Sequence, residues 1–581
     1  MLKARNARIL VAPEIMADSG SSQLYAAKEL RYYLSRITGV SVPIESGSDE
    51  AGAILVGSAS GLDISGISDD GFIIESSGDT VRLAGGCRGV LYAAYELLER
   101  LGVRFFTPTC EKVPTDPDAV IPDISSKQEP VFEYRRHSYA DIRQNPRFCA
   151  KLRFNGEPLP KRLGGGMTYA HFVHSFETLI PTSVYGESHP EYFALVDGSR
   201  VTRDGGRTQL CLSNPEVISL LIENTRKYLL DHPGHKIMSL SQNDWGGNCQ
   251  CDNCRKIDEE EGSPAGTLLR AVNAVAEALE PEFPDVIFDT LAYNYSRPAP
   301  NITRNRHNVC VRLCSIECCF CHPFADCDDD KRSVSRPDGT KSKFITDLRD
   351  WGKICDRMYI WDYTTCFAHY PTPHPNWRVL QPNAQAFAEN NVKGVFEQPN
   401  GASHGGVDFN ELRAYLISRL LWDPWCDLSA HRREFMEYYY GEAAPALDEY
   451  LDLLCDTAEK YDHVGFNDNP IHRFLEEDML EKYSALFDKA ELAVAADPMR
   501  RIRVQKARLS IRWVALKRKT MLRGEFDPAE INAFFTDWKA FGLSRIDEWC
   551  NVETTHRALL EGKWRGVEYF DHWTGEEPEL F

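Results

Sequence analysis

Short apolar segments alternate with amphipathic helical segments from about residue 131 to residue 422, and this alternation constrains the fold more than any other feature. Helices are expected after Asn214-Pro215 and Ser263-Pro264, because Asn and Ser cap helix N-termini and Pro suits the first turn. Two more are expected at "NAQAFAEN" and "DFNELRAYLISRLL". Eight segments have the pattern of strands, namely "FEYRRHSYA", "KLRFNG", "TQLCLS", "KIMSLSQND", "VIFDTLAYN", "NVCVRLCSIE", "RMYIWDY" and "GVFEQP".

Repeated strand–helix alternation implies parallel strands joined by right-handed crossovers. Eight such units predict an α/β fold with a central (β/α)8 TIM barrel, which would be the catalytic domain over residues 131–422. A doubly wound open sheet is the alternative. Dinucleotide binding has no support, because no G-x-G-x-x-G follows an early strand.

The flanking regions differ from the central one. Residues 1–125 predict a small α/β domain, with a helix at "QLYAAKELRYYLSRITG" that ends at Gly39 and a second helix at "GVLYAAYELLERLG". Pro and Asp in "PTDPDAVIPDISSKQEP" indicate a linker. Residues 423–581 have helical periodicity in "ALDEYLDLLCDTAEKYDHV", "EEDMLEKYSALFDKAELAVA" and "RIRVQKARLSIRWVALKRKTML", which predicts a helical C-terminal domain.

The composition excludes some partners. The 581 residues carry a formal net charge of −20, and a diffuse acidic balance argues against nucleic acid. No apolar run has the length of a membrane span or of a signal-peptide core, so a cytoplasmic location is expected. The 11 Trp and 24 Tyr slightly favour carbohydrate binding, because sugars stack on aromatic faces. An oligosaccharide or glycoside is the expected partner.

Polar and aromatic residues collect where the predicted barrel strands end, and in a TIM barrel these ends carry the chemistry. Glycoside hydrolysis needs one carboxyl group that protonates the leaving oxygen and a second that stabilises or attacks the anomeric carbon. A single acidic residue at a strand end is more often a helix cap or an ion-pair partner, so the hypothesis depends on their coincidence. The candidates along the strands are Arg136, Asn243, Asp244, Trp245, Tyr293, Tyr295, Glu317, Trp361, Asp362 and Glu397.

Histidines between the second and third predicted strands are further candidates. His171 and His174 lie three residues apart, and His189 follows. A spacing of three could offer two metal ligands, but hydrogen bonding to substrate or a structural role is the preferred interpretation.

Cysteines form two clusters. Cys249, Cys251 and Cys254 follow the fourth strand, and a second run after the sixth includes Cys319, Cys321, His322 and Cys327. Cys-x2-Cys with distant partners is a zinc-type arrangement, and Cys249, Cys251, Cys254 and Cys321 are one possible structural set. Free packed thiols and disulfides are the alternatives. No cofactor is expected for catalysis, since Cys-rich metal sites are closed and structural.

Two stretches resemble known families. "GVLYAAYELLERLGVRFFTP" resembles the end of the small N-terminal α/β domain of α-glucuronidases and of family 20 and family 84 hexosaminidases. "HFVHSFETLIPTSVYGESHPEYFALVDGSR", followed by "TQLCLSNPEV" and "SLSQNDWGGNCQCDNC", resembles a bacterial domain family long described only as uncharacterised. Part of that family is classified as glycoside hydrolase family 163, which acts as endo-β-N-acetylglucosaminidases on N-glycans. The resemblance covers roughly residues 20–420.

The resemblance implies roles by position. Asp244 would be the general acid, and Asn243 would orient the acetamide of the substrate. An Asn before the acid also resembles retaining enzymes with a carboxylate nucleophile on strand 7, which would make Asp362 the nucleophile. Arg136 would hold sugar hydroxyls. Tyr293, Tyr295 and Trp361 would line the sugar site, with Glu317 and Glu397 as alternative acid, base or hydroxyl-binding groups.

The expected function is therefore a glycoside hydrolase, retaining in mechanism, that acts on a glycan containing an N-acetylhexosaminide. An α-glucuronidase-like hydrolase is the second hypothesis, with Arg135, Arg136 or Arg143 as partners for a uronate. The hypothesis from another class is a carbohydrate-binding barrel without catalysis.

Overall fold

The computed structural model describes residues 1–48, 51–202, 207–401, 403 and 406–563. The chain divides into two compact units, each built from separate stretches of sequence. Unit 1 comprises Met1–Gly166, Gly401–Tyr450 and Tyr483–Leu509. Unit 2 comprises Met167–Asn400, Leu451–Lys482 and Ser510–Phe581. This division differs from three consecutive domains.

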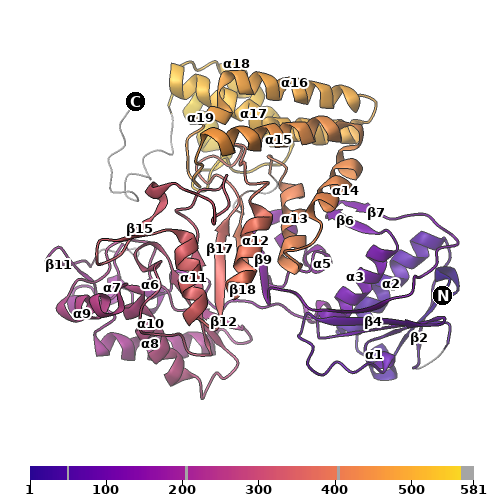
Figure 1. The fold of residues 1–581 in the computed structure, drawn as a ribbon, viewed down its shortest axis with the longest axis horizontal. Coiled ribbons are helices and arrows are strands. Elements are labelled where there is room, and N and C mark those ends of the chain that lie inside the picture. Colours follow the sequence, from indigo (N-terminus) through magenta and orange to yellow (C-terminus); the bar gives the residue numbers. More distant parts are fainter. Residues whose placement is uncertain (49–50, 203–206, 402, 404–405, 564–581) are drawn as a thin grey trace. The chain divides into compact units, whose positions relative to one another are not determined.

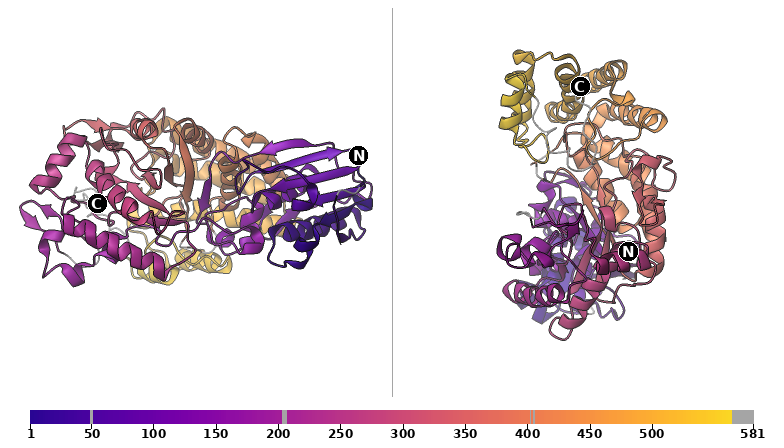
Figure 2. Two further views of the ribbon diagram at one scale, coloured as in Figure 1. Left: turned by 90° about the horizontal axis from the view of Figure 1, so that it is seen from below. Right: turned by 90° about the vertical axis from the view of Figure 1, so that its left-hand side faces the viewer.

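Unit 1 contains a mixed sheet of six strands in the order β2-β1-β3-β5-β4-β8. Strands β2, β1, β3 and β5 run parallel, and β4 runs antiparallel to both β5 and β8. Helices α2 and α3 pack on this sheet (Figure 1, Figure 2). The bounds are β1 Arg8–Val11, α2 Ser22–Thr38, β2 Ile44–Ser46, β3 Ala53–Val56, β4 Phe72–Ser77, β5 Thr80–Gly85, α3 Gly89–Arg100 and β8 Ser125–Gln128.

The signals that predicted helix α2 are the ones that form it. The Ser21 hydroxyl accepts a hydrogen bond from the backbone N–H of Gln23 and caps the N-terminus. The helix ends at Gly39, whose φ of 74° is in the left-handed region that favours glycine. One side of α2 is buried, including Leu30 and Leu34. The predicted helix and its stop at Gly39 are confirmed.

The predicted linker is partly wrong. Its last part, "SSKQ", forms strand β8, which pairs antiparallel with β4. An exposed strand with little apolar content resembles a linker in sequence, because its ordering comes from backbone pairing. The other strands and α-helices that lie wholly within unit 1 are α1 Pro13–Ala17, β6 Arg104–Thr107, β7 Cys110–Lys112, β9 Tyr134–His137, α4 Ala140–Arg143, α5 Pro146–Lys151, α13 Asn410–Trp422 and α14 Leu428–Tyr440.

Unit 2 is built on a curled, parallel half-barrel sheet. Five of its strands neighbour one another in the order β12-β13-β14-β17-β18, and every pairing between them is parallel. Their bounds are β12 Ile237–Ser239, β13 Ile287–Ala292, β14 Val309–Cys314, β17 Met358–Tyr363 and β18 Val392–Gln398. The last five predicted barrel segments therefore do form strands, and β9 matches the first.

The second and third predicted barrel segments do not form strands in the described part of the chain, and a complete eight-stranded barrel is not established. In "KLRFNG", Arg153 has a φ of 61°, which breaks the extended backbone. In "TQLCLS", Leu210 forms an isolated antiparallel bridge with Phe193. By contrast, Tyr169 forms a parallel bridge with Ile237 of β12, in a segment that the hydrophobic pattern did not single out.

Helices connect the strands of unit 2. Helix α8 begins with Pro215, and the Asn214 side chain accepts the backbone N–H of Glu216, so this predicted helix start is confirmed. The helices that lie wholly within unit 2 are α6 Phe176–Leu179, α7 Thr182–Tyr185, α8 Pro215–Asp231, α9 Asp252–Glu261, α10 Ala265–Leu279, α11 Phe344–Ile354, α12 Leu380–Glu389, α18 Pro528–Ala540 and α19 Val552–Leu560. Two short hairpins join β10 Leu195–Val196 with β11 Ser199–Arg200, and β15 Val334–Ser335 with β16 Lys341–Ser342.

Three long helices supply residues to both units. They are α15 Ala444–Tyr461, α16 Glu477–Ala493 and α17 Pro498–Arg523, and each begins in one unit and ends in the other. They match the three helical stretches predicted near the C-terminus. Within the described ranges, no helix combines the length and the apolar character needed to cross a membrane.

Candidate active site

A cavity of about 640 Å³ opens in unit 2 where the carboxyl ends of the parallel strands meet. Parallel strands all end at the same edge of their sheet, so the residues that follow them converge there. The strands and their following loops supply Asn243, Asp244, Trp245, Leu291, Tyr293, Cys314, Ile316, Trp361, Tyr363 and Gln398. Other segments of the same unit supply Val173, His174, Glu177, Arg207, Phe367, Phe466, Asn467, Glu548 and Trp549.

Asp244 is the acidic residue that follows strand β12 into the cavity. Its side chain is 55% exposed. The hydroxyl of Tyr293 donates a hydrogen bond of 2.9 Å to Asp244 Oδ1, so the carboxylate is held in one orientation. His174 Nε2 lies 4.0 Å from the same oxygen.

His174 is held by its backbone and by its other ring nitrogen. Its φ of 55° is unusual for a residue with a side chain, and such conformations often mark functional sites. Nδ1 is 2.7 Å from the carbonyl oxygen of Gln242, which can only accept, so Nδ1 carries the proton. Burial lowers the pKa of His174, while the charge of Asp244 opposes this shift. In the neutral ring, the nitrogen that faces Asp244 is therefore Nε2, which carries no proton.

Asn243 positions the loop that carries Asp244. Its Oδ1 accepts the backbone N–H of Glu177, and its Nδ2 donates to the carbonyl of Thr208, each at 2.9 Å. The Gln209 side chain bonds both the N–H and the carbonyl of Asn243. The side-chain amide is thus engaged within the protein, which does not favour the predicted role in orienting an acetamide.

Glu548 is the carboxylate that sequence reasoning missed. It comes from the C-terminal segment, and its backbone N–H donates to the carbonyl of Phe367 at 3.1 Å. Burial raises the pKa of Glu548 to about 7, and the negative charge of Asp244 adds to this shift. The local sequence "SRIDEWCN" gives no signal for Glu548: it has no periodic pattern of apolar residues, and it follows no predicted strand. Only the fold brings this glutamate to the cavity.

Asp362 and Glu397 lie outside the cavity, although both were predicted as catalytic candidates. Side chains alternate along a strand, and Trp361 and Tyr363 of β17 line the cavity, so Asp362 points to the other face of the sheet. Asp362 and Glu397 are register partners on β17 and β18, and each is 5% exposed. Burial raises the pKa of Asp362 to about 6. Burial and the neighbouring Asp362 raise the pKa of Glu397 well above its ordinary value.

The remaining predicted residues also lie away from the cavity lining. Glu317 pairs with the buried Arg297 at 3.1 Å. His171 Nε2 is 3.2 Å from the hydroxyl of Thr178. Tyr295 lines a separate small pocket beside Cys249 and Cys254. Arg136 belongs to unit 1, where its guanidinium donates to Glu157 at 2.9 Å.

Aromatic rings form much of the cavity wall. The rings of Trp361 and Tyr363 stack with centroids 6.2 Å apart, and Trp361 Nε1 donates to Gln398 Oε1 at 2.7 Å. Trp549 is 38% exposed. Such surfaces suit the apolar faces of sugar rings, while the polar edges remain for hydroxyl groups.

A buried charged layer supports these rings. Asp289 of β13 and Arg312 of β14 stand two positions before cavity-lining residues, so they share a sheet face with them. They form a fully buried ion pair of 2.8 Å. The guanidinium of Arg312 lies 5.0 Å from the Trp361 ring centroid, which fixes the position of that ring.

The cysteine clusters assemble differently from the predicted set. Cys249, Cys251 and Cys254 group with Cys211, and Cys319, His322 and Cys327 group with His463. Cys321 lies 3.4 Å from Cys319 in the second group. The four-residue set with Cys321 is therefore not assembled, because the loops after β12 and β14 recruit separate partners.

Comparisons with known proteins give distant likenesses. The sequence matches no curated protein. A family 89 glycoside hydrolase from Clostridium perfringens has 12% identity and a TM-score of 0.48, over 90% of this chain and 66% of that one. The chitobiase of Flavobacterium johnsoniae has 11% identity and a TM-score of 0.45, over 97% and 96%. The Streptomyces plicatus N-acetyl-β-hexosaminidase has 12% identity and a TM-score of 0.42, over 76% and 90%.

These TM-scores all lie below 0.5, so the likeness by itself assigns no activity to this chain. Family membership rests on sequence. The family described as "Domain of unknown function (DUF4838)" matches residues 105–452, which is more than half of the chain, and the protein therefore belongs to this family.

Proposed function

We propose that the protein is a glycoside hydrolase and that Asp244 and Glu548 are its two catalytic carboxyl groups. The observation that carries the proposal is that both carboxyl groups line one aromatic cavity. There, burial and the charge of Asp244 raise the pKa of Glu548. Enzymes that break glycosidic bonds use two carboxyl groups whose surroundings separate their protonation.

Glu548 is the better candidate for the general acid. With a pKa raised to about 7, it keeps a substantial protonated fraction near neutral pH and can protonate a leaving oxygen. Asp244, oriented by the Tyr293 hydroxyl, then serves as nucleophile or as general base. This reverses the role expected for Asp244 from the sequence.

Two variants separate these roles. Glu548→Gln should abolish hydrolysis of a natural glycan, yet largely spare the first step on an aryl glycoside with an activated leaving group. Asp244→Asn should remove activity on both substrates. Glu553→Gln is the control, because Glu553 is exposed on α19 and does not line the cavity. If Asp244→Asn spares the activated substrate and Glu548→Gln does not, Asp244 is the acid.

We further propose an N-acetylhexosaminide as the sugar. Three features support it. Residues 20–420 resemble a family of which part acts on N-glycans, the apolar side chains of Val173 and Leu291 suit an acetamide methyl group, and Asn467 offers its side-chain oxygen as a hydrogen-bond acceptor. Asn467 Oδ1 is buried and has no hydrogen-bond partner among the described residues, so it can accept an acetamide N–H or a sugar hydroxyl.

A uronate-cleaving activity is the second candidate, because Arg207 is a cation at the cavity lining. The cations expected from the sequence do not line this cavity. Arg135 pairs with Asp70 and Arg136 with Glu157, and Arg143 is exposed at the end of α4, all within unit 1.

A panel of 4-nitrophenyl glycosides distinguishes the candidates. Cleavage of β-N-acetylglucosaminide or β-N-acetylgalactosaminide in preference to glucuronide supports the first proposal. A preference for glucuronide that Arg207→Ala abolishes supports the second. Binding of glycans without cleavage of any, measured by calorimetry, would make the protein a carbohydrate-binding barrel and overturn the enzymatic proposal.

A further inference from the structure

Four cysteine sulfurs in unit 2 meet at the spacing of a tetrahedral metal site. The Sγ atoms of Cys211, Cys249, Cys251 and Cys254 all lie within 4.8 Å of one another. Cys211 Sγ is 3.6 Å from Cys251 Sγ and 4.0 Å from Cys254 Sγ. Zinc–sulfur bonds of about 2.3 Å in a tetrahedron separate the sulfurs by roughly 3.8 Å, whereas a disulfide needs about 2.05 Å.

The surroundings of this group suit thiolates. The backbone N–H of Leu195 points to Cys249 Sγ at 3.4 Å, and a guanidinium nitrogen of Arg200 lies 3.7 Å from it. The Ser213 hydroxyl is 3.1 Å from Cys254 Sγ. Hydrogen-bond donors of this kind commonly surround metal-bound thiolates and disperse their charge.

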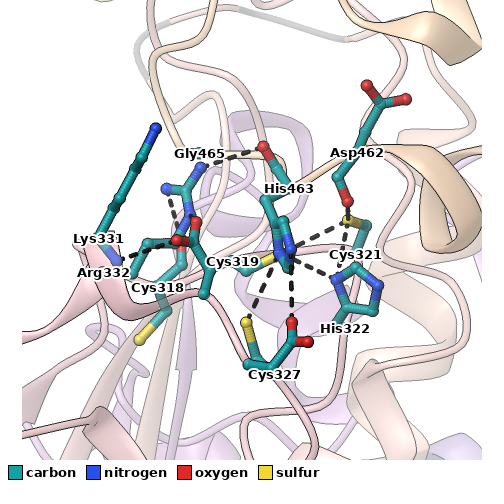
Figure 3. A network of polar contacts seen from close by, with 12 residues as sticks. Cys318, Cys319, Cys321, His322, Cys327, Lys331, Arg332, Asp462, His463 and Gly465 are labelled. Atoms are coloured by element: carbon teal, nitrogen blue, oxygen red, sulfur yellow. Dashed lines mark hydrogen bonds and ion pairs between the residues drawn. The ribbon is translucent and has the colours of Figure 1, made fainter.

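A second group combines two cysteines with two histidines. Figure 3 shows Cys319, Cys327 and the rings of His322 and His463 converging on one point. His322 Nδ1 lies 3.3 Å from Cys319 Sγ, and His463 Nδ1 lies 3.8 Å from Cys327 Sγ. Both rings therefore turn the same nitrogen inward.

The outer nitrogen of His322 is held as in metal-binding histidines, and that of His463 faces a carboxylate group. His322 Nε2 is 2.8 Å from the carbonyl oxygen of Glu459, which can only accept a hydrogen bond, so Nε2 carries the proton. His463 Nε2 is 3.6 Å from a carboxylate oxygen of Asp328. A proton on the outer nitrogen leaves the lone pair of Nδ1 free for an ion, and such second contacts orient most histidine ligands.

We propose that the protein binds two structural zinc ions in unit 2, one at Cys211, Cys249, Cys251 and Cys254 and one at Cys319, His322, Cys327 and His463. Thiolate and imidazole ligands in fours select zinc and leave no open position for chemistry. Zinc binding displaces the thiol protons into solvent. Cys321 stands outside the set, because its Sγ donates to the carbonyl of Asp462 at 3.3 Å.

Each ion would hold a wall of the cavity. Cys211 is two residues from Gln209, whose side chain bonds the carbonyls of Asn243 and Trp245, and Cys249 follows the same loop. The second group joins the loop after β14 to the segment that supplies Phe466 and Asn467 to the cavity. The backbone N–H of Phe320 in this loop also donates to the carbonyl of Val464 in that segment, at 2.8 Å. The metal proposal does not depend on which sugar the cavity binds.

Zinc content of the intact protein tests the proposal. After expression with added zinc and gel filtration, mass spectrometry of the metal should give two zinc ions per chain. Cys251→Ser and Cys327→Ser should each give one, and their combination none. Cys87→Ser and Cys321→Ser are the matched controls and should keep two, since Cys87 is exposed in unit 1 and Cys321 is not a ligand.

If a variant does not fold, the two zinc sites can still be tested by measurements on the wild-type protein. Titration with a mercurial reagent should release two zinc ions to a chromogenic chelator, and cadmium-substituted protein should give two ¹¹³Cd resonances, for S4 and S2N2 coordination. Two ions and these two resonances support the proposal. A content of one or none, or disulfides among these cysteines in the non-reduced protein, overturns it.

Discussion

Glu548 and Asp244 line the same cavity, but their surroundings differ. Asp244 is half exposed and accepts a hydrogen bond from Tyr293, whereas Glu548 is partly buried. A carboxyl group with a pKa near 7 can deliver a proton at neutral pH, which an ordinary glutamate with a pKa of about 4.3 does far less well.

The pH dependence of hydrolysis should report this residue. A general acid must be protonated, so kcat/KM should fall about tenfold per pH unit as the pH rises beyond the pKa of about 7. With an activated aryl glycoside, whose leaving group needs little protonation, the wild type should show a much weaker alkaline limb and Glu548→Gln none. Initial rates from pH 5 to 9 measure it, and an unchanged limb in the variant would assign it to another group.

The pair Asp362 and Glu397 should affect stability more than catalysis. Both pKa values are raised, so the folded chain retains protons that the unfolded chain releases above about pH 4. The free energy of unfolding should therefore fall as the pH rises from 5 to 8. Glu397→Gln should reduce this fall by on the order of 1 kcal/mol, since the neutral amide needs no proton.

Urea unfolding at pH 5 and pH 8 measures this effect, with Glu553→Gln as the control for an exposed glutamate. Most activity should survive in Glu397→Gln. A loss as large as that of Asp244→Asn would return Glu397 to a catalytic role.

The backbone conformation at the C-terminal end of helix α2 contributes to the stability of unit 1. Gly39 ends α2 with a φ of 74°, and the space where a Cβ would stand is open. Gly39→Ala should thus destabilise unit 1 only through the left-handed backbone, by about 1 kcal/mol. Gly39→Asn should cost less, because Asn tolerates this region. Urea unfolding compares the two, and equal losses would contradict the backbone explanation.

Local signals predicted most elements but not all pairings. The cap at Asn214 and the glycine at position 39 act within a few residues, so sequence alone locates their helices. The second predicted strand failed because Arg153 turns into the left-handed region, and β8 went unnoticed because partner strands order it. These outcomes depend on contacts distant in the chain.

The same limit applies to the candidate site. Asp244, Tyr293 and Trp361 follow or end predicted strands, and they line one cavity. Side chains alternate along a strand, so Asp362 cannot line the cavity when Trp361 does. The sequence alone does not show which face of the strand is turned toward the cavity. Glu548 and His463 carry no local signal, since each joins its group from far along the chain.

Both groups of metal-ligating side chains, Cys211 with its three cysteine partners and Cys319 with its three partners, belong to unit 2. No such group of metal-ligating side chains occurs in the described residues of unit 1. Removal of zinc should therefore loosen one unit selectively. After chelation, hydrogen exchange should increase in residues 209–254 and 315–327 and remain slow in the sheet of β1, β3 and β5. Equal exchange with and without chelator would contradict the structural role.

The passage of α15, α16 and α17 between the units has a consequence for biosynthesis. Unit 2 contains strands made midway through translation, yet Glu548 joins its cavity only after α17 and α18 have followed. A nascent chain released after Arg523 would carry Asp244, Trp361 and Tyr363 but neither Glu548 nor Trp549. The proposed enzyme should thus stay inactive on the ribosome until the segment that carries Glu548 has emerged.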